Sequence, residues 1–186
     1  AGRWPDQVNH LDDDAALAAV ATPHVNPEQG IDSAADALAG ARDIVAETVT
    51  EDPDVREAVR DLTRRRGAVT SRAVPDQDED VLAQFQEYAE YTEPMRRIHP
   101  HRILAINRGG KLGALRVKVE LDPAEALDLI YRHTVRRRHR QGNGSPSEPV
   151  PAPLTALLKD AIEDGYKRLL APTIEREMRQ ELTERA

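Results

Sequence analysis

The chain has 186 residues, a net charge of −7 and no cysteine, which excludes a disulfide-based fold, a cysteine zinc site and thiol catalysis. No apolar run approaches the roughly 20 residues that cross a bilayer, so we expect no membrane partner and a cytoplasmic location. Aromatic residues make up only 3% of the chain. A core built mainly from Leu, Ile, Val and Ala suits packed helices, and the sequence therefore predicts a mainly α-helical fold.

The N-terminal half predicts short helices separated by loops. Residues 1–30 form a poorly structured lead-in with one short helix over 14–21, because prolines interrupt the rest. A capping pair, Ser33 with Asp36, starts a helix over 34–49. An acidic cap followed by proline starts the next, over about 53–66. We expect a loop over 67–78 and a helix from Val81 to about Tyr91.

The stretch from His99 to Asp122 predicts a β-hairpin over about 101–121. Its first half contains a continuous apolar run, Ile103 to Ile106, as in a strand covered on both faces. Its second half alternates apolar and charged residues from Leu115 to Leu121, as in a strand with one wet face. Glycines lie between the two halves, where a turn needs them.

The C-terminal half predicts two helices joined by a linker. A cap and proline, Asp122-Pro123, start a helix that ends near Arg138. Residues 142–153 are rich in Pro, Gly and Ser and read as a linker. Residues 154–186 form one long helix, broken near Pro172 because proline removes a backbone donor. We therefore divide the chain into 1–30, a helical region with the hairpin over 31–141, the linker, and 154–186.

Basic residues are concentrated in one part of this acidic chain. Residues 95–140 hold 12 Lys and Arg against 4 Asp and Glu, whereas residues 1–94 hold 8 against 21. Either the block binds a polyanion or it neutralises the acidic half, and the lack of interleaved aromatics slightly favours the second interpretation. If nucleic acid is bound, the candidate residues are Arg102, Arg108, Lys111, Arg116, Lys118, Arg136, Arg137 and Arg138.

Motifs that carry catalysis or bind a cofactor are absent from the sequence. His99 and His101 could face the same way, but no third metal ligand lies nearby. The glycines of residues 109–113 lack the order of a phosphate-binding loop, and no serine stands in a nucleophile elbow. We therefore expect no catalytic residue, no metal, no cofactor and no small-molecule substrate.

Three stretches, in order along the chain, resemble the bacterial Tex transcription accessory proteins. The first is VNPEQGIDSAADALAGARDIVAE, from Val25 to Glu47. The second runs from Tyr91 to Asp122 and carries Glu93-Pro94, Pro100-His101-Arg102, Leu104-Ala105 and Arg108-Gly109 at the family's SEP, PSHR-ALA and RG positions. The third is GYKRLLAPTIEREMRQELTERA, from Gly165 to Ala186. The chain departs from the family pattern at His99, at Thr173 and in the proline-rich segment around residues 142–153.

The resemblance implies a multidomain, nucleic-acid-associated protein related to a eukaryotic elongation factor that travels with RNA polymerase. Such proteins carry an RNase H-like domain of YqgF type, a helix-hairpin-helix module and an S1-type RNA-binding domain. This chain resembles only the helical region before the RNase H-like domain. The last residues still read as running helix, so we expect a piece of a longer protein.

The functional hypothesis is a non-catalytic scaffold that helps to bind RNA or DNA, with RNA polymerase or the transcription machinery as a further partner. Three residues of the last helix are then expected to pack against missing domains: Ile174, Met178 and Leu182. Two alternatives stay open, a protein-interaction module that recruits the transcription machinery and a metal-dependent nuclease.

Overall fold

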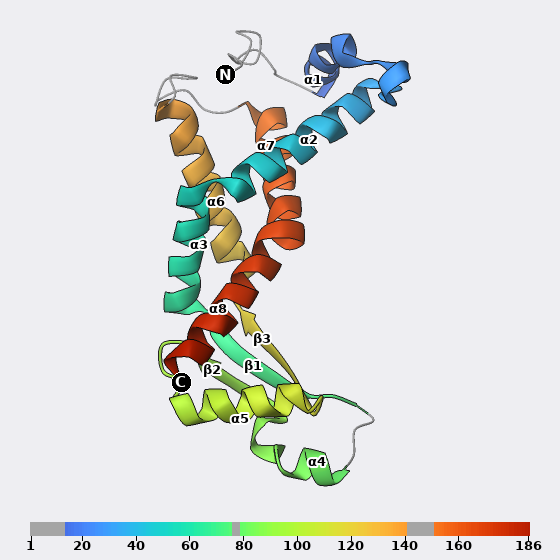
Figure 1. The fold of residues 1–186 in the computed structure, drawn as a ribbon. Helices are drawn as coiled ribbons and strands as arrows, with labels where there is room; N and C mark the ends of the chain where they lie inside the picture. Colours follow the sequence, from blue (N-terminus) through green and yellow to red (C-terminus); the bar gives the residue numbers. More distant parts are fainter. Residues whose placement is uncertain (1–13, 76–78, 141–150) are drawn as a thin grey trace. The chain divides into compact units, whose positions relative to one another are not determined.

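The computed structural model describes residues 14–75, 79–140 and 151–186. The fold is mainly α-helical, as predicted, with one small antiparallel sheet (Figure 1). The chain divides into two compact units. Unit 1 takes in Ala1–Val55 and Leu127–Leu170, and unit 2 takes in Arg56–Ala126 and Ala171–Ala186. Each unit thus combines segments that are distant in sequence, whereas the division expected from the sequence follows chain order.

Unit 1 is helical in its described part. Its elements, in chain order, are α1 (Asp14–Ala21), two 3₁₀ turns (Thr22–His24 and Pro27–Gln29), α2 (Ala34–Glu51), the later part of α6 (Pro123–Arg140), α7 (Ala152–Gly165) and the π-helical segment η5 (Tyr166–Leu170). Helix α2 packs along α7, and α1 packs against both. The helices predicted over 14–21 and 34–49 are thereby confirmed.

Small residues let α2 and α7 approach closely. Ala46 on α2 and Ala161 on α7 are fully buried. A Cβ added to Gly165 would lie 2.9 Å from Thr50 Cγ2 and 3.0 Å from the Ala46 carbonyl oxygen. The Thr50 hydroxyl donates hydrogen bonds to the carbonyls of Ala46 and Glu47, at 2.9 and 3.1 Å, which fixes its methyl group against that glycine. The contact therefore depends on the absence of a side chain at position 165.

The predicted helix starts are present with their caps. The Ser33 hydroxyl accepts a hydrogen bond from the Asp36 backbone N–H at 3.2 Å and donates to the Asp36 carboxylate at 2.7 Å. Asp52 Oδ1 accepts from the Asp54 N–H at 2.9 Å, at the start of α3 (Pro53–Arg66). Asp122 caps α6 in the same way, through the N–H of Ala124 at 2.9 Å. Each cap satisfies a backbone donor that the first helical turn leaves without a partner.

Unit 2 combines a three-stranded sheet with helices. Its elements are α3 from Arg56 onward, β1 (Ala68–Ala73), α4 (Glu79–Ala83), a 3₁₀ turn (Gln86–Tyr88), β2 (Glu90–Pro94), α5 (Pro100–Lys111), β3 (Leu115–Glu120), the first turn of α6 and α8 (Ala171–Arg185). The strands are antiparallel in the order β2-β1-β3. Helices α5 and α8 pack on β3 and on each other.

The predicted hairpin over 101–121 is wrong in its first half. Residues 100–111 form helix α5, and only 115–120 form a strand. Ile103 and Ile106 are buried, three residues apart, while Leu104 between them is 53% exposed. That is the spacing of one helical face. The partner of β3 is instead β1, in the segment expected to be a loop. The helix expected from Val81 to about Tyr91 is also wrong over most of its length, because α4 ends at Ala83 and a 3₁₀ turn over Gln86–Tyr88 leads into β2 at Glu90.

The sheet has one covered and one open face. Val69, Val117 and Val119 point to the covered face, where they line a small cavity with Ile103, Ile106 and Leu182 from α5 and α8. Ser71 shares this face, is fully buried, and donates a 2.7 Å hydrogen bond to the carbonyl of Tyr88. The alternate residues of each strand therefore face away from α5 and α8.

The interruption predicted near Pro172 takes the form of the π-helical segment η5, which ends two residues before that proline. Pro172 has no N–H, and its ring crowds the carbonyl of Arg168, which lies within η5. A wider helical turn before the proline accommodates that carbonyl. Most of the predicted linker, residues 142–150, lies outside the described residues, and α7 begins at Ala152.

Candidate nucleic-acid interface

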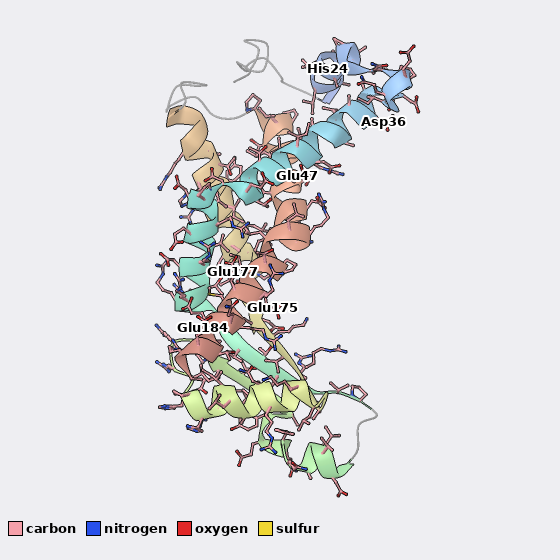
Figure 2. All side chains as sticks on the ribbon, in the orientation of Figure 1. His24, Asp36, Glu47, Glu175, Glu177 and Glu184 are labelled. Carbon is pink, nitrogen blue, oxygen red and sulfur yellow. The ribbon has the colours of Figure 1, made fainter. Side chains whose placement is uncertain are left out.

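Helix α8 carries three stripes of different chemistry. Because an α-helix turns about 100° per residue, positions that recur every three or four residues share a face. One stripe is buried and consists of Ile174, Met178 and Leu182. A second carries Glu177, Glu181 and Glu184. The third lines a groove and comprises Pro172, Glu175, Arg176, Arg179, Gln180 and Thr183. Figure 2 labels Glu175, Glu177 and Glu184 along this helix.

Two residues of the acidic stripe, Glu177 and Glu181, form ion pairs with arginines of α3. Arg56 Nη2 lies 3.2 Å from Glu177 Oε1, and Arg60 Nε lies 2.7 Å from Glu177 Oε2. Arg64 Nη2 lies 3.0 Å from Glu181 Oε2. The hydrogen bond from Arg60 lowers the pKa of Glu177, and the same bond raises the pKa of Arg60. Together with the buried stripe, these pairs are satisfied only when the third stripe of α8 points away from both the core and α3.

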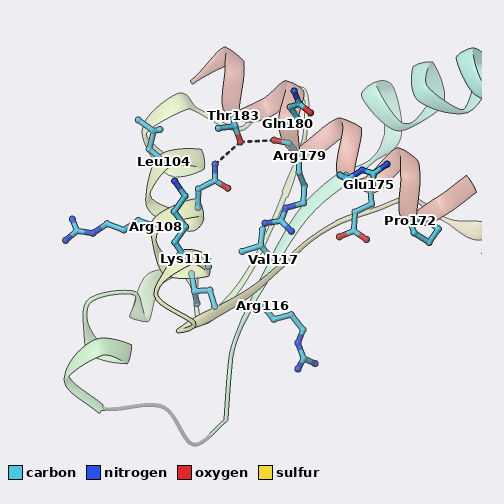
Figure 3. A pocket seen from close by; sticks show the side chains of 14 residues that line it. Leu104, Arg108, Lys111, Arg116, Val117, Pro172, Glu175, Arg179, Gln180 and Thr183 are labelled. Carbon is cyan, nitrogen blue, oxygen red and sulfur yellow. Dashed lines mark hydrogen bonds between the residues drawn. The ribbon is translucent and has the colours of Figure 1, made fainter. Parts of the chain in front are cut away.

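The third stripe of α8 forms one wall of a groove of about 920 Å³, called here the α5–α8 groove (Figure 3). Helix α5 supplies the other wall through Leu104, Arg108 and Lys111, and strand β3 supplies Leu115, Arg116 and Val117. The lining holds five basic residues and one acidic residue: Arg108, Lys111, Arg116, Arg176 and Arg179, with Glu175. Within the described part of the chain, none of these five makes an ion pair with a carboxylate.

The two walls of the groove are joined directly. The Asn107 side chain on α5 donates a 2.9 Å hydrogen bond to the Thr183 hydroxyl on α8, which in turn donates to the Arg179 carbonyl at 2.8 Å (Figure 3). The Arg179 side chain extends toward Val117, while Arg108 and Arg116 extend outward from the rim. The groove therefore combines an apolar floor with basic walls.

Two of the predicted residues, Arg116 and Lys118, also lie on the open face of the sheet. Both are exposed, and they alternate with the buried Leu115, Val117 and Val119. Register places Arg72 of β1 directly opposite Arg116 and Thr70 opposite Lys118. Like charges directly opposite on a sheet repel each other, so a bound anion would relieve a repulsion that the fold alone leaves in place.

Arg102 differs from the other predicted residues because its charge is paired with a carboxylate of the same chain, in a cluster with Tyr91 and Glu93. Its guanidinium lies 2.9 Å from the Glu93 carboxylate and 3.3 Å from the Tyr91 hydroxyl, which itself donates to Glu93. The hydrogen bond from Tyr91, followed by that from Arg102, lowers the pKa of Glu93. Burial, followed by the bond to Glu93, raises the pKa of Tyr91. Arg102 therefore ties α5 to β2.

The remaining predicted residues are placed as follows. Arg136, Arg137 and Arg138 belong to unit 1, near the end of α6, and Arg136 is exposed. The side chains of the other two are outside the described residues. Ile174, Met178 and Leu182 are at most 4% exposed within unit 2. Their predicted contact with a further domain stays a prediction.

Sequence reasoning missed Arg72, Arg176 and Arg179. Arg72 lay in a segment interpreted as a loop, so no strand register was available to place it opposite Arg116. For α8, only the apolar positions were followed around the helix. Placing the charged positions around the helix as well would have shown that Arg176 and Arg179 lie about a third of a turn or more away from Glu177 and Glu181.

No group of three or more His, Asp or Glu residues among those described is arranged to hold a metal ion. His99 and His101 stack with ring centroids 5.8 Å apart. None of the described helices has the length and apolar character that crossing a membrane requires.

The chain matches the model of the Tex central region-like family over residues 12–186. The chain belongs to the Tex family. It is 35% identical over 181 residues to the Bacillus subtilis (strain 168) protein YdcI, covering 97% of this chain and 24% of that protein. It is 30% identical over 169 residues to human S1 RNA-binding domain-containing protein 1, covering 86% of this chain and 16% of that protein.

A third relative of this Tex-family chain is the protein tex of Bordetella pertussis (strain Tohama I), 38% identical over 105 residues, which cover 56% of the chain and 13% of the relative. The chain therefore spans about a quarter or less of the length of these curated relatives. The predicted family is confirmed.

Proposed function

We propose that this chain is a non-catalytic scaffold region of a Tex protein and contributes to nucleic-acid binding during transcription. The observation that carries the proposal is the α5–α8 groove, whose five basic side chains have no carboxylate partner among the described residues. An acidic chain that leaves these charges without partners in one place is suited to bind a polyanion. The interpretation of the basic block as internal neutralisation accounts for Arg102 but not for the three groove residues that belong to the block, Arg108, Lys111 and Arg116.

Two kinds of relative support this proposal by name. One is called S1 RNA-binding domain-containing protein 1. Another, from Neisseria gonorrhoeae, is called transcriptional accessory protein Tex and is 27% identical over 119 residues. Nucleic acid and the transcription machinery are therefore the proposed partners of the longer protein, and this chain is proposed to supply one of its basic surfaces.

The test is binding of fluorescent RNA and DNA oligonucleotides to the 186-residue chain over a range of salt concentrations. Affinity is expected to fall steeply with salt, because bound phosphates release counterions. Changing Arg108, Lys111 and Arg116 together to Glu is expected to abolish measurable binding. All three are exposed, so the change leaves the core intact.

The matched control changes Arg42, Arg65 and Arg97 to Glu. These side chains are also exposed, lie outside the groove and make no ion pair in the described part of the chain. The net charge is then equal in both variants, so a loss of binding shared by the control would reflect total charge and count against the groove. Absence of binding at low salt would overturn the proposed function.

A further inference from the structure

Helix α2 of unit 1 has a face that no described part of that unit covers. Its opposite face packs on α1 and α7 and buries Ala46, Val49 and Thr50. Because an α-helix turns about 100° per residue, Ile44 lies about half a turn away from these three residues. Ile44 is 66% exposed and is the most exposed of the large apolar residues described. A single exposed apolar residue is ordinary on a protein surface, but the positions around Ile44 share its lack of cover.

Gly40 lies one helical turn before Ile44 on the same face. A Cβ at Gly40 would meet no other part of the described chain within 4 Å, and the φ of Gly40 is not positive. Neither close packing nor backbone conformation within unit 1 therefore requires glycine here, although glycine weakens the interior of a helix. A second helix that approached this face closely would supply the requirement, as Gly165 of α7 shows on the opposite face of α2.

Three carboxylates lie in a row beside Ile44. Asp43, Glu47 and Glu51 recur every four residues and therefore follow one side of the helix; Figure 2 labels Glu47. All three are exposed, and none makes an ion pair with a described residue. The one basic residue of α2, Arg42, lies about 160° around the helix from Ile44. The row therefore carries negative charge alone.

The chemistry of this surface selects the kind of partner. We call it the α2 outer face and define it by Gly40, Asp43, Ile44, Glu47 and Glu51. Its negative charge repels nucleic acid and complements Lys and Arg. Its apolar centre and the open space over the glycine fit a helix that carries one apolar stripe, because such a helix can lie close to another along its length.

We infer that the α2 outer face binds a basic amphipathic helix of a partner protein. An apolar side chain of that helix lies over Gly40 and against Ile44, and its Lys or Arg residues lie along Asp43, Glu47 and Glu51. The inference goes beyond the proposed function, because α2 belongs to unit 1, whereas the α5–α8 groove belongs to unit 2 and has the opposite charge.

The probe is a fluorescent peptide of about 18 residues, which is long enough to form a helix in isolation. It carries a stripe of Leu between two rows of Lys, and its matched control carries Glu in place of every Lys. Fluorescence anisotropy measures the binding of both peptides to the 186-residue chain. The Lys peptide is expected to bind, and the Glu peptide is not. Ile44→Ser should weaken binding of the Lys peptide about tenfold.

A pair of charge reversals tests the acidic row. Changing Asp43 and Glu47 together to Lys should weaken binding of the Lys peptide more than about tenfold at low salt, because like charges then face each other. The matched control changes Glu28 and Glu87 to Lys. Both are exposed and make no ion pair with a described residue. At physiological salt the control should alter the affinity less than about twofold, since distant charges are screened.

A third variant tests the close approach at Gly40. Gly40→Gln adds a side chain that projects into solvent in the chain alone, and glutamine favours a helix more than glycine does. The melting temperature should therefore rise, while the affinity for the Lys peptide should fall severalfold. A fall in affinity without a loss of stability identifies a blocked surface, and unchanged affinity would contradict the close approach of a helix.

The outcomes separate this inference from the proposed function. Equal binding of the Lys and Glu peptides, or wild-type affinity in Ile44→Ser, overturns the inference. Self-association overturns it in favour of a second copy of the chain, if light scattering shows a mass that rises with concentration and Ile44→Ser abolishes that rise. Such a copy would present the exposed Leu104 and Leu112 of α5 beside basic residues. The oligonucleotide assay of the groove does not depend on any of these results, so either proposal can fail alone.

Discussion

Helices α2 and α7 of unit 1 and helices α3 and α8 of unit 2 are held together by opposite kinds of contact. The first pair meets through Ala46, Ala161 and Gly165, which let the backbones approach closely. The second pair is joined by ion pairs that Glu177 and Glu181 accept from arginines. The first contact is therefore sensitive to side-chain size, and the second to charge, pH and salt.

The largest effect is expected where α8 enters the core of unit 2. Met178 is 1% exposed, and truncating it to Ala leaves a cavity, so Met178→Ala should lower the free energy of unfolding by about 2–5 kcal/mol. The conservative Met178→Leu should cost less than about 1.5 kcal/mol. Urea unfolding followed by circular dichroism measures both. An equal loss of unfolding free energy in the two variants would show that the side-chain volume of Met178 is not what stabilises the core.

A smaller effect is expected at the close contact of unit 1. Gly165→Ala places a methyl group against Thr50 and Ala46 and should destabilise the chain by about 1–2 kcal/mol. Gly40→Ala on α2 is the matched control, because a Cβ there meets nothing within 4 Å. That control should gain about 0.5–1 kcal/mol from the higher helix propensity of Ala. The same substitution is thus expected to lower the free energy of unfolding at position 165 and to raise it at position 40. An increase at both positions would contradict the prediction.

The smallest effect is expected at the ion pairs of unit 2. Glu177→Gln removes the charge that Arg56 and Arg60 share and should cost about 1 kcal/mol at neutral pH and low salt. Glu184→Gln is the control, since Glu184 accepts only from Gln180 among the described residues. In 1 M NaCl the cost of Glu177→Gln should shrink, whereas a salt-independent cost would indicate packing.

The pH dependence of this pair has a definite sign. The pKa of Glu177 is lowered in the folded chain from its ordinary value of 4.5, so the unfolded chain takes up a proton first as pH falls. The stabilisation is complete above the ordinary value and is lost as pH falls through the lowered one. The difference in unfolding free energy between wild type and Glu177→Gln should therefore narrow below about pH 4.5. A constant difference down to pH 3 would contradict it.

The helices were predictable where their caps and apolar spacing agreed. Ser33, Asp52 and Asp122 each cap a helix that the structure contains. These signals are local, so they depend little on tertiary packing.

Helix α5 was misread because its own signals conflicted. Pro100 stands at the first helical position, which is a helix signal. The apolar run after it resembled a strand, and Gly109 inside the helix resembled a turn. Glycine weakens a helix, but a Cβ at this position would lie 2.6 Å from the Leu115 side chain. Close packing of α5 on β3 therefore requires glycine there, and only the folded structure reveals that requirement.

Strands β1 and β2 were missed because polar residues occupy their covered face. Ser71 of β1 is fully buried, and Tyr91 and Glu93 of β2 are paired across from Ser71 and Val69. The hydrogen bond that Ser71 donates to the Tyr88 carbonyl, and the cluster of Tyr91 and Glu93 with Arg102, satisfy these groups. The apolar alternation that marks a half-buried strand is then absent from the sequence. The groove was beyond prediction for a different reason: its floor belongs to β3 and its walls to helices about 70 residues apart, which only the folded chain brings together.

The three stripes of α8 have a consequence for how this region can evolve. Exchanging one residue alters one contact, with the core, with α3 or with the groove. Inserting or deleting one residue would turn everything beyond it by about 100°. A charged stripe would then meet the core, and the apolar stripe would meet α3 or the groove. We therefore expect members of the family to vary in the side chains of this helix while keeping the number of residues between its first and last contacts constant.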